Sequence, residues 1–259
     1  DSEFDLLQFE VVNNKDLAGQ NARAVTSPTE AADIVRASWQ VGDGPLVPLT
    51  SYVEATGVSV LHADFQGADV DGFTLRPIKA RPVIVLNRDR PADRMRFSLA
   101  HEYAHSVLHA FPYEAMEEEA NQFAAELLMP RNGIIADLSS RRLTLPYLGQ
   151  LKLKWQVAMS ALIYRARELG VISANMATSL WIDMKEYRKK EPPQFDFAKE
   201  QTKLVPDLIA AHIEQLGYSL PELALALRTV PDEFAHMHGL IAPEIKHQKP
   251  KLKLVVSRE

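Results

Sequence analysis

The sequence predicts an α+β protein, in which a small antiparallel sheet is followed by helices over most of the remaining chain. Three short segments between residues 58 and 87 carry the β-branched and apolar residues typical of strands, and turn-forming Gly, Asp and Pro residues separate them. Beyond them, apolar residues recur at the three- and four-residue spacing of amphipathic helices. We therefore expect one sheet that leads into a mainly helical region.

Composition restricts the class of protein. The 259 residues are enough for one large domain or two small ones, and none of them is Cys, which excludes disulfides and thiolate metal ligands. No apolar run approaches the 18 residues that a membrane span needs, so we expect no membrane partner. The N-terminus has no signal-peptide pattern, and we expect a cytoplasmic location. Because the chain starts without Met, we also expect that the full protein has a further domain upstream.

The first 87 residues divide into four parts. Residues 1–26 have no firm period and are predicted to form an N-terminal arm. The stretch Ser27-Pro28-Thr29-Glu30 is a capping box with Pro at the first helical position, so it predicts a helix that runs toward Trp39. A second helix is expected to end at Gly57. Strands are then expected at residues 58–65, 72–76 and 82–87, arranged as an antiparallel meander.

The sequence His101-Glu102-Tyr103-Ala104-His105 is an H-E-x-x-H motif. It lies in a segment predicted to be helical, because Pro91 can open the first turn and no Gly or Pro interrupts residues 92–111. Two histidines four residues apart lie on one helix face, so both imidazoles can bind one Zn²⁺ ion at about 2.0–2.1 Å. Glu102 lies about 100° round the helix and can act as general base on a water molecule. The motif therefore predicts a hydrolytic zinc site.

A third protein ligand is needed, and the acidic run at residues 117–119 offers three candidates. Glu119 lies four residues before Phe123, on the edge of the buried face predicted for the next helix, and we choose it for this reason. For Glu117 and Glu118, the simpler interpretation is that they complement the positive end of the helix dipole. His109 lies about 12 Å along the helix from His101 and is predicted to support the site without binding the metal.

The run around the motif resembles a known family. The stretches R-F-x-L-A-H-E-x-A-H and E-A-N-x-F-A-A-E-L-L-M-P are similar to the ImmA/IrrE family of bacterial zinc metallopeptidases, which cleave helix-turn-helix transcriptional repressors. The resemblance implies a zincin-like fold over residues 27–135, with His101, His105 and Glu119 as metal ligands and Glu102 as general base. It also implies Zn²⁺ as cofactor, with Mn²⁺ as an alternative, and a helix-turn-helix repressor as the protein substrate.

Helical patterns continue beyond the predicted peptidase domain. Residues 136–190 are expected to contain a helical segment at 148–169, which looks like the helical module that follows the peptidase in this family and is similar to a helix-turn-helix unit. Residues 191–259 are expected to form a C-terminal helical region, with helices at 203–216 and 219–227, and a Lys-rich tail. The later helix resembles helix-turn-helix regulators. His236 and His238 have a spacing unsuited to one helical face and are treated as ordinary polar residues.

Charge distribution leaves two functions open. Residues 131–190 hold 11 Lys and Arg residues against 4 Asp and Glu residues, although the whole chain has a net charge of −5. Such a segment can bind nucleic acid, meet an acidic partner or neutralise its own neighbours. We predict a zinc-dependent endopeptidase. The alternative is a transcription regulator, in which an inactive peptidase fold is a sensor or scaffold and the helical modules, or a missing N-terminal domain, bind DNA or a partner protein.

Overall fold

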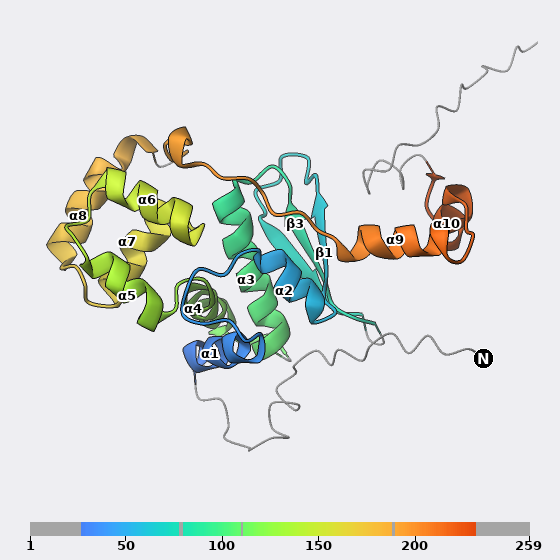
Figure 1. Cartoon of the computed structure of the whole chain (residues 1–259), viewed down its shortest axis with the longest axis horizontal. Coiled ribbons are helices and arrows are strands. Elements are labelled where there is room, and N and C mark those ends of the chain that lie inside the picture. Colours follow the sequence, from blue (N-terminus) through green and yellow to red (C-terminus); the bar gives the residue numbers. More distant parts are fainter. Residues whose placement is uncertain (1–26, 78–79, 110, 188–189, 232–259) are drawn as a thin grey trace, which may run out of the picture. The chain divides into compact units, whose positions relative to one another are not determined.

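The computed structural model describes residues 27–77, 80–109, 111–187 and 190–231. Within these residues the protein contains ten α-helices and one three-stranded sheet, so the α+β class is confirmed (Figure 1). The helices are α1 (Pro28–Ser38), α2 (Leu49–Ala55), α3 (Ala92–Leu108), α4 (Met116–Leu128), α5 (Arg131–Ser139), α6 (Leu145–Trp155), α7 (Met159–Glu168), α8 (Ala174–Asp183), α9 (Leu204–Glu214) and α10 (Leu220–Ala226). The chain divides into two compact units, residues 1–205 and 206–259. The predicted domain boundaries at residues 135 and 190 remain predictions.

The sheet is mixed, and the predicted antiparallel meander is wrong. Its strands are β1 (Ser59–Ala63), β2 (Gly72–Leu75) and β3 (Val83–Asn87), in the order β1-β3-β2. β3 pairs parallel with β1 and antiparallel with β2. The physical reason is burial: the most apolar strand, β3, takes the central position, where Ile84, Val85 and Leu86 are buried. β2 is left at an edge, and its residues Phe73 and Leu75 are exposed.

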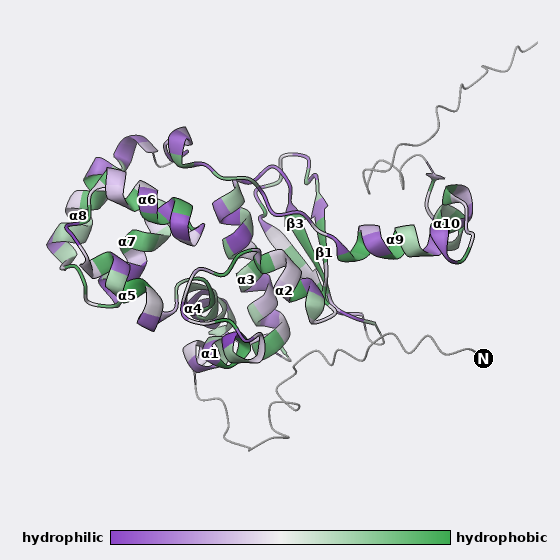
Figure 2. Ribbon diagram, in the orientation of Figure 1, coloured by the Kyte–Doolittle hydropathy of each residue, from purple (hydrophilic) through white to green (hydrophobic). Residues whose placement is uncertain are grey.

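Helix α3 packs against both β2 and β3 of the sheet, and also against α2 and α4. Its buried side chains include Leu99, Ala100 and Ala104, at the spacing of one helix face. Figure 2 shows hydrophilic and hydrophobic residues alternating along this helix, and His101 and Glu102 are among its half-buried residues. The helix ends at Leu108, where the sequence predicted a run to residue 111, because His109 adopts an extended backbone.

Local signals at α1 and α2 were interpreted correctly. The Ser27 side chain accepts a hydrogen bond from the backbone N–H of Glu30, which confirms the predicted N-cap of α1. Gly57 follows α2 with a φ of +85°, a left-handed conformation that favours Gly. Both signals depend only on a few neighbouring residues, so the sequence is sufficient to predict them.

The helices α5–α8 lie together on one side of the first unit (Figure 1). The helical segment expected at residues 148–169 consists of two helices, α6 and α7, separated by Gln156, Val157 and Ala158. Gln156 has a φ of 53°, which ends α6 without a Gly or Pro in the sequence. Long-range contacts stabilise this break: the indole N–H of Trp155 donates to Asp137, and the carboxylate of Glu191 accepts from the backbone N–H groups of Met159 and Ser160.

Residues 190–203 follow as a segment that we call the strap (orange in Figure 1). A carboxylate near each end of the strap binds groups on the neighbouring helices. Glu191 caps α7 and pairs with the buried Lys152 at 2.9 Å, and Glu200 accepts from the backbone N–H groups of Leu49 and Thr50 at the start of α2. Glu200 also pairs with buried Arg96. The strap therefore links α7, α3 and α2 through buried or half-buried charges.

The second unit is described up to residue 231 and contains most of α9 and all of α10. Both helices were predicted, and α10 begins with a complete capping box between Ser219 and Glu222. The predicted N-terminal arm, the Lys-rich tail, His236 and His238 lie outside the described residues. No helix in the described ranges combines the length and apolarity needed to cross a membrane.

Candidate metal centre

His101 and His105 lie one above the other on α3, as the four-residue spacing predicts. Their Nε2 atoms are 3.1 Å apart, and the two rings are nearly perpendicular, with an interplanar angle of 77°. Both imidazoles therefore present the same nitrogen to one point beside the helix. Burial, followed by the neighbouring His101, lowers the pKa of His105 to about 4, which keeps this imidazole neutral at neutral pH.

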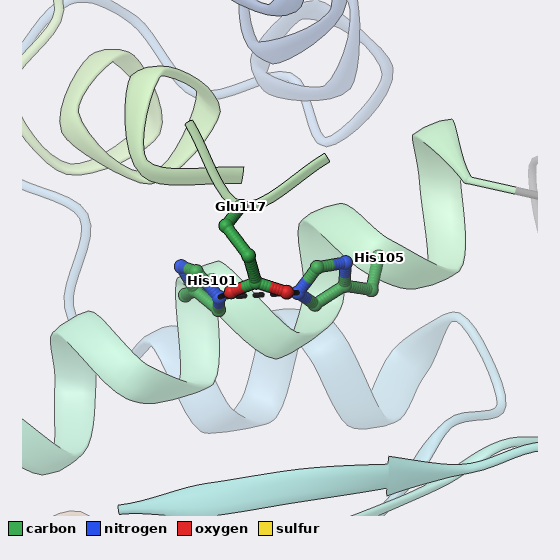
Figure 3. Close-up of side chains that lie close together, drawn as sticks. All are labelled: His101, His105 and Glu117. Carbon is green, nitrogen blue, oxygen red and sulfur yellow. Dashed lines mark hydrogen bonds and ion pairs between the residues drawn. The ribbon is translucent and has the colours of Figure 1, made fainter. Parts of the chain in front are cut away.

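The carboxylate that reaches this pair belongs to Glu117, from the first turn of α4 (Figure 3). Its Oε2 lies 3.2 Å from Nε2 of His101, and its Oε1 lies 3.5 Å from Nε2 of His105. Among the described residues, His101, His105 and Glu117 form the metal-competent group, with one donor atom from each within 4.8 Å of the others. This group is the candidate metal centre.

The donor atoms suit a tetrahedral ion. Zinc bonds of about 2.0–2.1 Å place neighbouring donor atoms about 3.3–3.4 Å apart. The two Nε2 atoms are 3.1 Å apart, and they lie 3.2 and 3.5 Å from the two different oxygens of the Glu117 carboxylate. Two imidazoles and one carboxylate are also a donor set that zinc binds in catalytic sites. The residues present therefore fit the metal that the sequence suggested.

The structure does not bring Glu119, the third ligand chosen from the sequence, to the two histidines. The hydroxyl of Tyr113 donates to Glu119 Oε2 at 2.5 Å, and the same oxygen lies 3.5 Å from Nε2 of His109. Positions 117 and 119 are two residues apart, or about 200° round a helix, so their side chains project to different sides of α4. Glu119 is half-buried, as predicted, but its side of α4 faces His109.

The remaining nitrogen of each histidine also has a partner. Nδ1 of His101 lies 3.0 Å from Oδ1 of Asn121, and Nδ1 of His105 lies 2.8 Å from Nδ1 of His109. Partners at Nδ1 fix the ring orientation and the tautomer, leaving Nε2 as the lone-pair donor. The sequence analysis missed Asn121. Its signal is the four-residue spacing from Glu117, which places both on one face of α4.

Glu102, the predicted general base, lies between α3 and the edge strand. The hydroxyl of Thr74 on β2 donates to Glu102 Oε2 at 2.7 Å. Burial raises the pKa of the Glu102 carboxyl, while the hydrogen bond from Thr74 and the positive charge of Arg76 act in the opposite direction. Thr74 holds the carboxylate in one orientation beside His101, and the sequence analysis did not find this contact.

Tyr103, Tyr113 and His109 lie near the motif and have groups that could donate to a developing oxyanion, but all three are engaged elsewhere. Tyr103 is buried against Trp39 and Phe123, and burial raises the pKa of its hydroxyl to about 12. The Tyr113 hydroxyl donates to Glu119, and Nδ1 of His109 is paired with His105. The oxyanion donor stays unassigned among these three.

Residues 53–167, from α2 to α7, match the peptidase M78 family, described as the IrrE N-terminal-like domain. The chain contains an IrrE N-terminal-like domain. This match supports a metallopeptidase of the ImmA/IrrE type, as the motif resemblance implied, and a peptidase implies a protein substrate. The matched segment holds all three residues of the candidate metal centre and Glu102. No curated protein matches the chain.

Proposed function

We propose that this IrrE N-terminal-like domain is a zinc-dependent endopeptidase. The observation that carries the proposal is the convergence of His101, His105 and Glu117 from two helices, with the carboxylate of Glu102 next to them on α3. His101, His105 and Glu117 would hold the ion. When bound, a zinc ion acts as a Lewis acid, which polarises the scissile carbonyl and makes a water molecule more acidic.

Glu102 moves the proton in this proposal. Its carboxylate takes a proton from the attacking water and then passes it to the departing amine. The Thr74 hydroxyl donates to one oxygen, Oε2, which leaves the other, Oε1, to take the proton. Burial raises the pKa of Glu102, which strengthens it as a base relative to an exposed carboxylate.

Strand β2 supports an extended substrate. It forms the edge of the described sheet and lies along α3, with Thr74 in contact with Glu102 and Arg76 donating to the carbonyl of His109. An edge strand presents backbone N–H and C=O groups to which an extended peptide can add. A peptide paired with β2 would pass the metal centre with its backbone exposed to Glu102.

The substrate class comes from the resemblance to the ImmA/IrrE family: a helix-turn-helix repressor, whose cleavage relieves repression. The rival function, a regulator that binds DNA through its basic segment, receives less support. Arg165, one of the arginines that suggested DNA contact, is buried and paired with Glu126 and Glu168. Lys152 is also buried in ion pairs. Part of the positive charge therefore neutralises neighbours inside the protein.

The test is cleavage by the purified chain. With Zn²⁺ supplied, we expect it to cut a helix-turn-helix repressor encoded beside it, and we expect Glu102→Gln to retain metal without cutting. His101→Ala should lose the metal as well. The absence of a product from the wild-type chain across several such repressors would count against the proposal, and salt-dependent binding of operator DNA, unchanged in Glu102→Gln, would favour the rival function.

A further inference from the structure

A cavity of about 1010 Å³ opens at the N-terminal end of α3, away from the three metal-centre residues. Its walls come from α3, α7, α8 and the strap. Five aromatic side chains line it, and we call it the aromatic cleft: Phe97, Tyr164, Trp181, Tyr187 and Phe197. A volume of this size is in the range of ligand-binding pockets.

The rings of the aromatic cleft remain accessible. Tyr164 is 64% exposed and stands against Trp181, with ring centroids 4.9 Å apart. Phe97 and Phe197 are half-buried. Large aromatic faces that remain open at a cavity wall are suited to contact with an apolar group from another molecule.

The aromatic cleft begins one turn of α3 from His101. Phe97 precedes His101 by four residues, so it lies on the same face of α3 and about 6 Å along the axis. Strand β2 runs beside the same helix: Asp71 pairs with Arg94 at 2.7 Å, and Thr74 contacts Glu102 at 2.7 Å. Asp71 and Arg94 also line the cleft. A peptide extended along β2 from Glu102 therefore arrives at the cleft within two or three residues.

The strand direction decides which part of the peptide arrives there. β2 runs from the cleft toward Arg76, beyond Glu102, and its other edge is already paired antiparallel with β3. Antiparallel pairing is the more stable arrangement, so an added peptide runs toward the cleft. Residues C-terminal to the bond beside Glu102 then reach the aromatic rings.

Charges at the aromatic cleft are largely satisfied within the protein. Asp71 pairs with Arg90 and Arg94, and Lys152 pairs with Asp93 and Glu191. A charged substrate side chain would have to compete with these pairs. The aromatic walls therefore favour an uncharged, apolar occupant.

We propose that the aromatic cleft is a substrate subsite, which takes an aromatic or large aliphatic side chain two or three residues C-terminal to the scissile bond. This inference rests on the peptidase function proposed above. It names the feature of the polypeptide that the enzyme selects, independently of which repressor carries it.

The subsite is tested by measuring how tightly peptides bind to a variant that is expected not to cleave them. The full chain with Glu102→Gln is titrated into two fluorescein-labelled pentapeptide amides, Ala-Ala-Phe-Ala-Ala and Ala-Ala-Ser-Ala-Ala, and anisotropy is measured. We expect the Phe peptide to bind about 10-fold more tightly, and we expect Tyr164→Ala and Trp181→Ala to remove this preference. Ile182→Ala is the matched control: Ile182 is 66% exposed next to Trp181 but does not line the cleft. It should keep the preference.

A second readout comes from Trp181 itself. Of the three Trp residues, Trp155 is buried and Trp181 lines the cleft, so the Phe peptide should change the Trp emission of the parent protein more than that of Trp181→Phe. Equal affinity for both peptides, or a preference that survives in both alanine variants, overturns the subsite. Circular dichroism confirms that each variant is folded.

The outcomes separate the two proposals. If the wild-type chain cuts no polypeptide, yet the Phe preference exists and Trp181→Ala removes it, the peptidase proposal fails, and the aromatic cleft is a peptide-binding site but not a substrate subsite. If wild type and Trp181→Ala cut polypeptides with the same residue preference, the subsite fails and the peptidase proposal stands.

Discussion

Nδ1 of His105 lies 2.8 Å from Nδ1 of His109, so one of the two nitrogens must carry the shared proton. If Nε2 of His105 is to offer a lone pair to a metal, its Nδ1 carries the hydrogen and donates to His109. His109 then has its own hydrogen on Nε2, which lies 3.5 Å from the carboxylate of Glu119. Glu119, the acid chosen from the sequence as a ligand, is therefore connected to the His105 imidazole only through His109.

The first prediction tests which of the two acids, Glu117 or Glu119, binds the metal. We expect Glu117→Gln to lower the metal content of the purified protein strongly, because it removes a donor at 3.2 Å from His101. Glu119→Gln should keep a stoichiometric ion. Metal analysis after dialysis against a weak chelator makes the comparison. If Glu117→Gln keeps its full metal content and Glu119→Gln loses metal, Glu119 is the third ligand, as chosen from the sequence.

The second prediction concerns His109. We expect His109→Phe to weaken metal affinity by about 10- to 100-fold, because His105 loses the acceptor that fixes its tautomer. His109→Gln, which keeps an acceptor, should recover part of that loss. Competition with a chromophoric chelator measures the affinity, and ¹⁵N NMR of the His105 ring reports the tautomer directly. Unchanged affinity in His109→Phe would show that the contact is only packing.

The third prediction concerns Thr74. Thr74→Val keeps the shape of the side chain but removes the hydroxyl that donates to Glu102 at 2.7 Å. We expect turnover of a cleavable polypeptide to fall about 10-fold, which corresponds to the loss of about 1.4 kcal/mol of orientation, with metal content unchanged. The kinetic constants and metal content are measured on one preparation. A variant with wild-type turnover would exclude the orienting role.

The fourth prediction concerns the strap. Glu191→Ala leaves the buried Lys152 with one close carboxylate, that of Asp93, and uncaps α7, so we expect unfolding free energy to fall by about 3 kcal/mol. The exposed Glu186 lies nearby in sequence, and Glu186→Ala should change stability by less than about 0.5 kcal/mol. Urea unfolding followed by circular dichroism compares them. Equal midpoints would mean that the strap contributes little.

Several features could be predicted because they depend on neighbours along the chain. The pairing of His101 with His105 follows from helical periodicity, and the caps at Ser27 and Ser219 follow from side chains that bond to backbone three residues away. The family resemblance, confirmed for residues 53–167, depends on the same local run. These features can be predicted without the fold, because the residues that produce them are close together in the sequence.

Other features needed long-range information. The break at Gln156 carries no Gly or Pro, and its stabilising contact comes from Glu191, more than 30 residues away. The parallel pairing of β1 with β3 depends on which strand is buried at the centre of the sheet. Neither contact leaves a periodic signal in the sequence.

The sequence by itself was enough to pair the two histidines, to place Glu102 beside them and to indicate the family, since all of these depend on one helical run. Only the tertiary structure shows that Glu117 lies beside the two histidines while Glu119 lies beside His109. Both acids start the same helix, and the choice between them depends on the side of α4 that lies against α3. The packing of α4 against α3 depends on contacts among core residues that are far apart in the sequence.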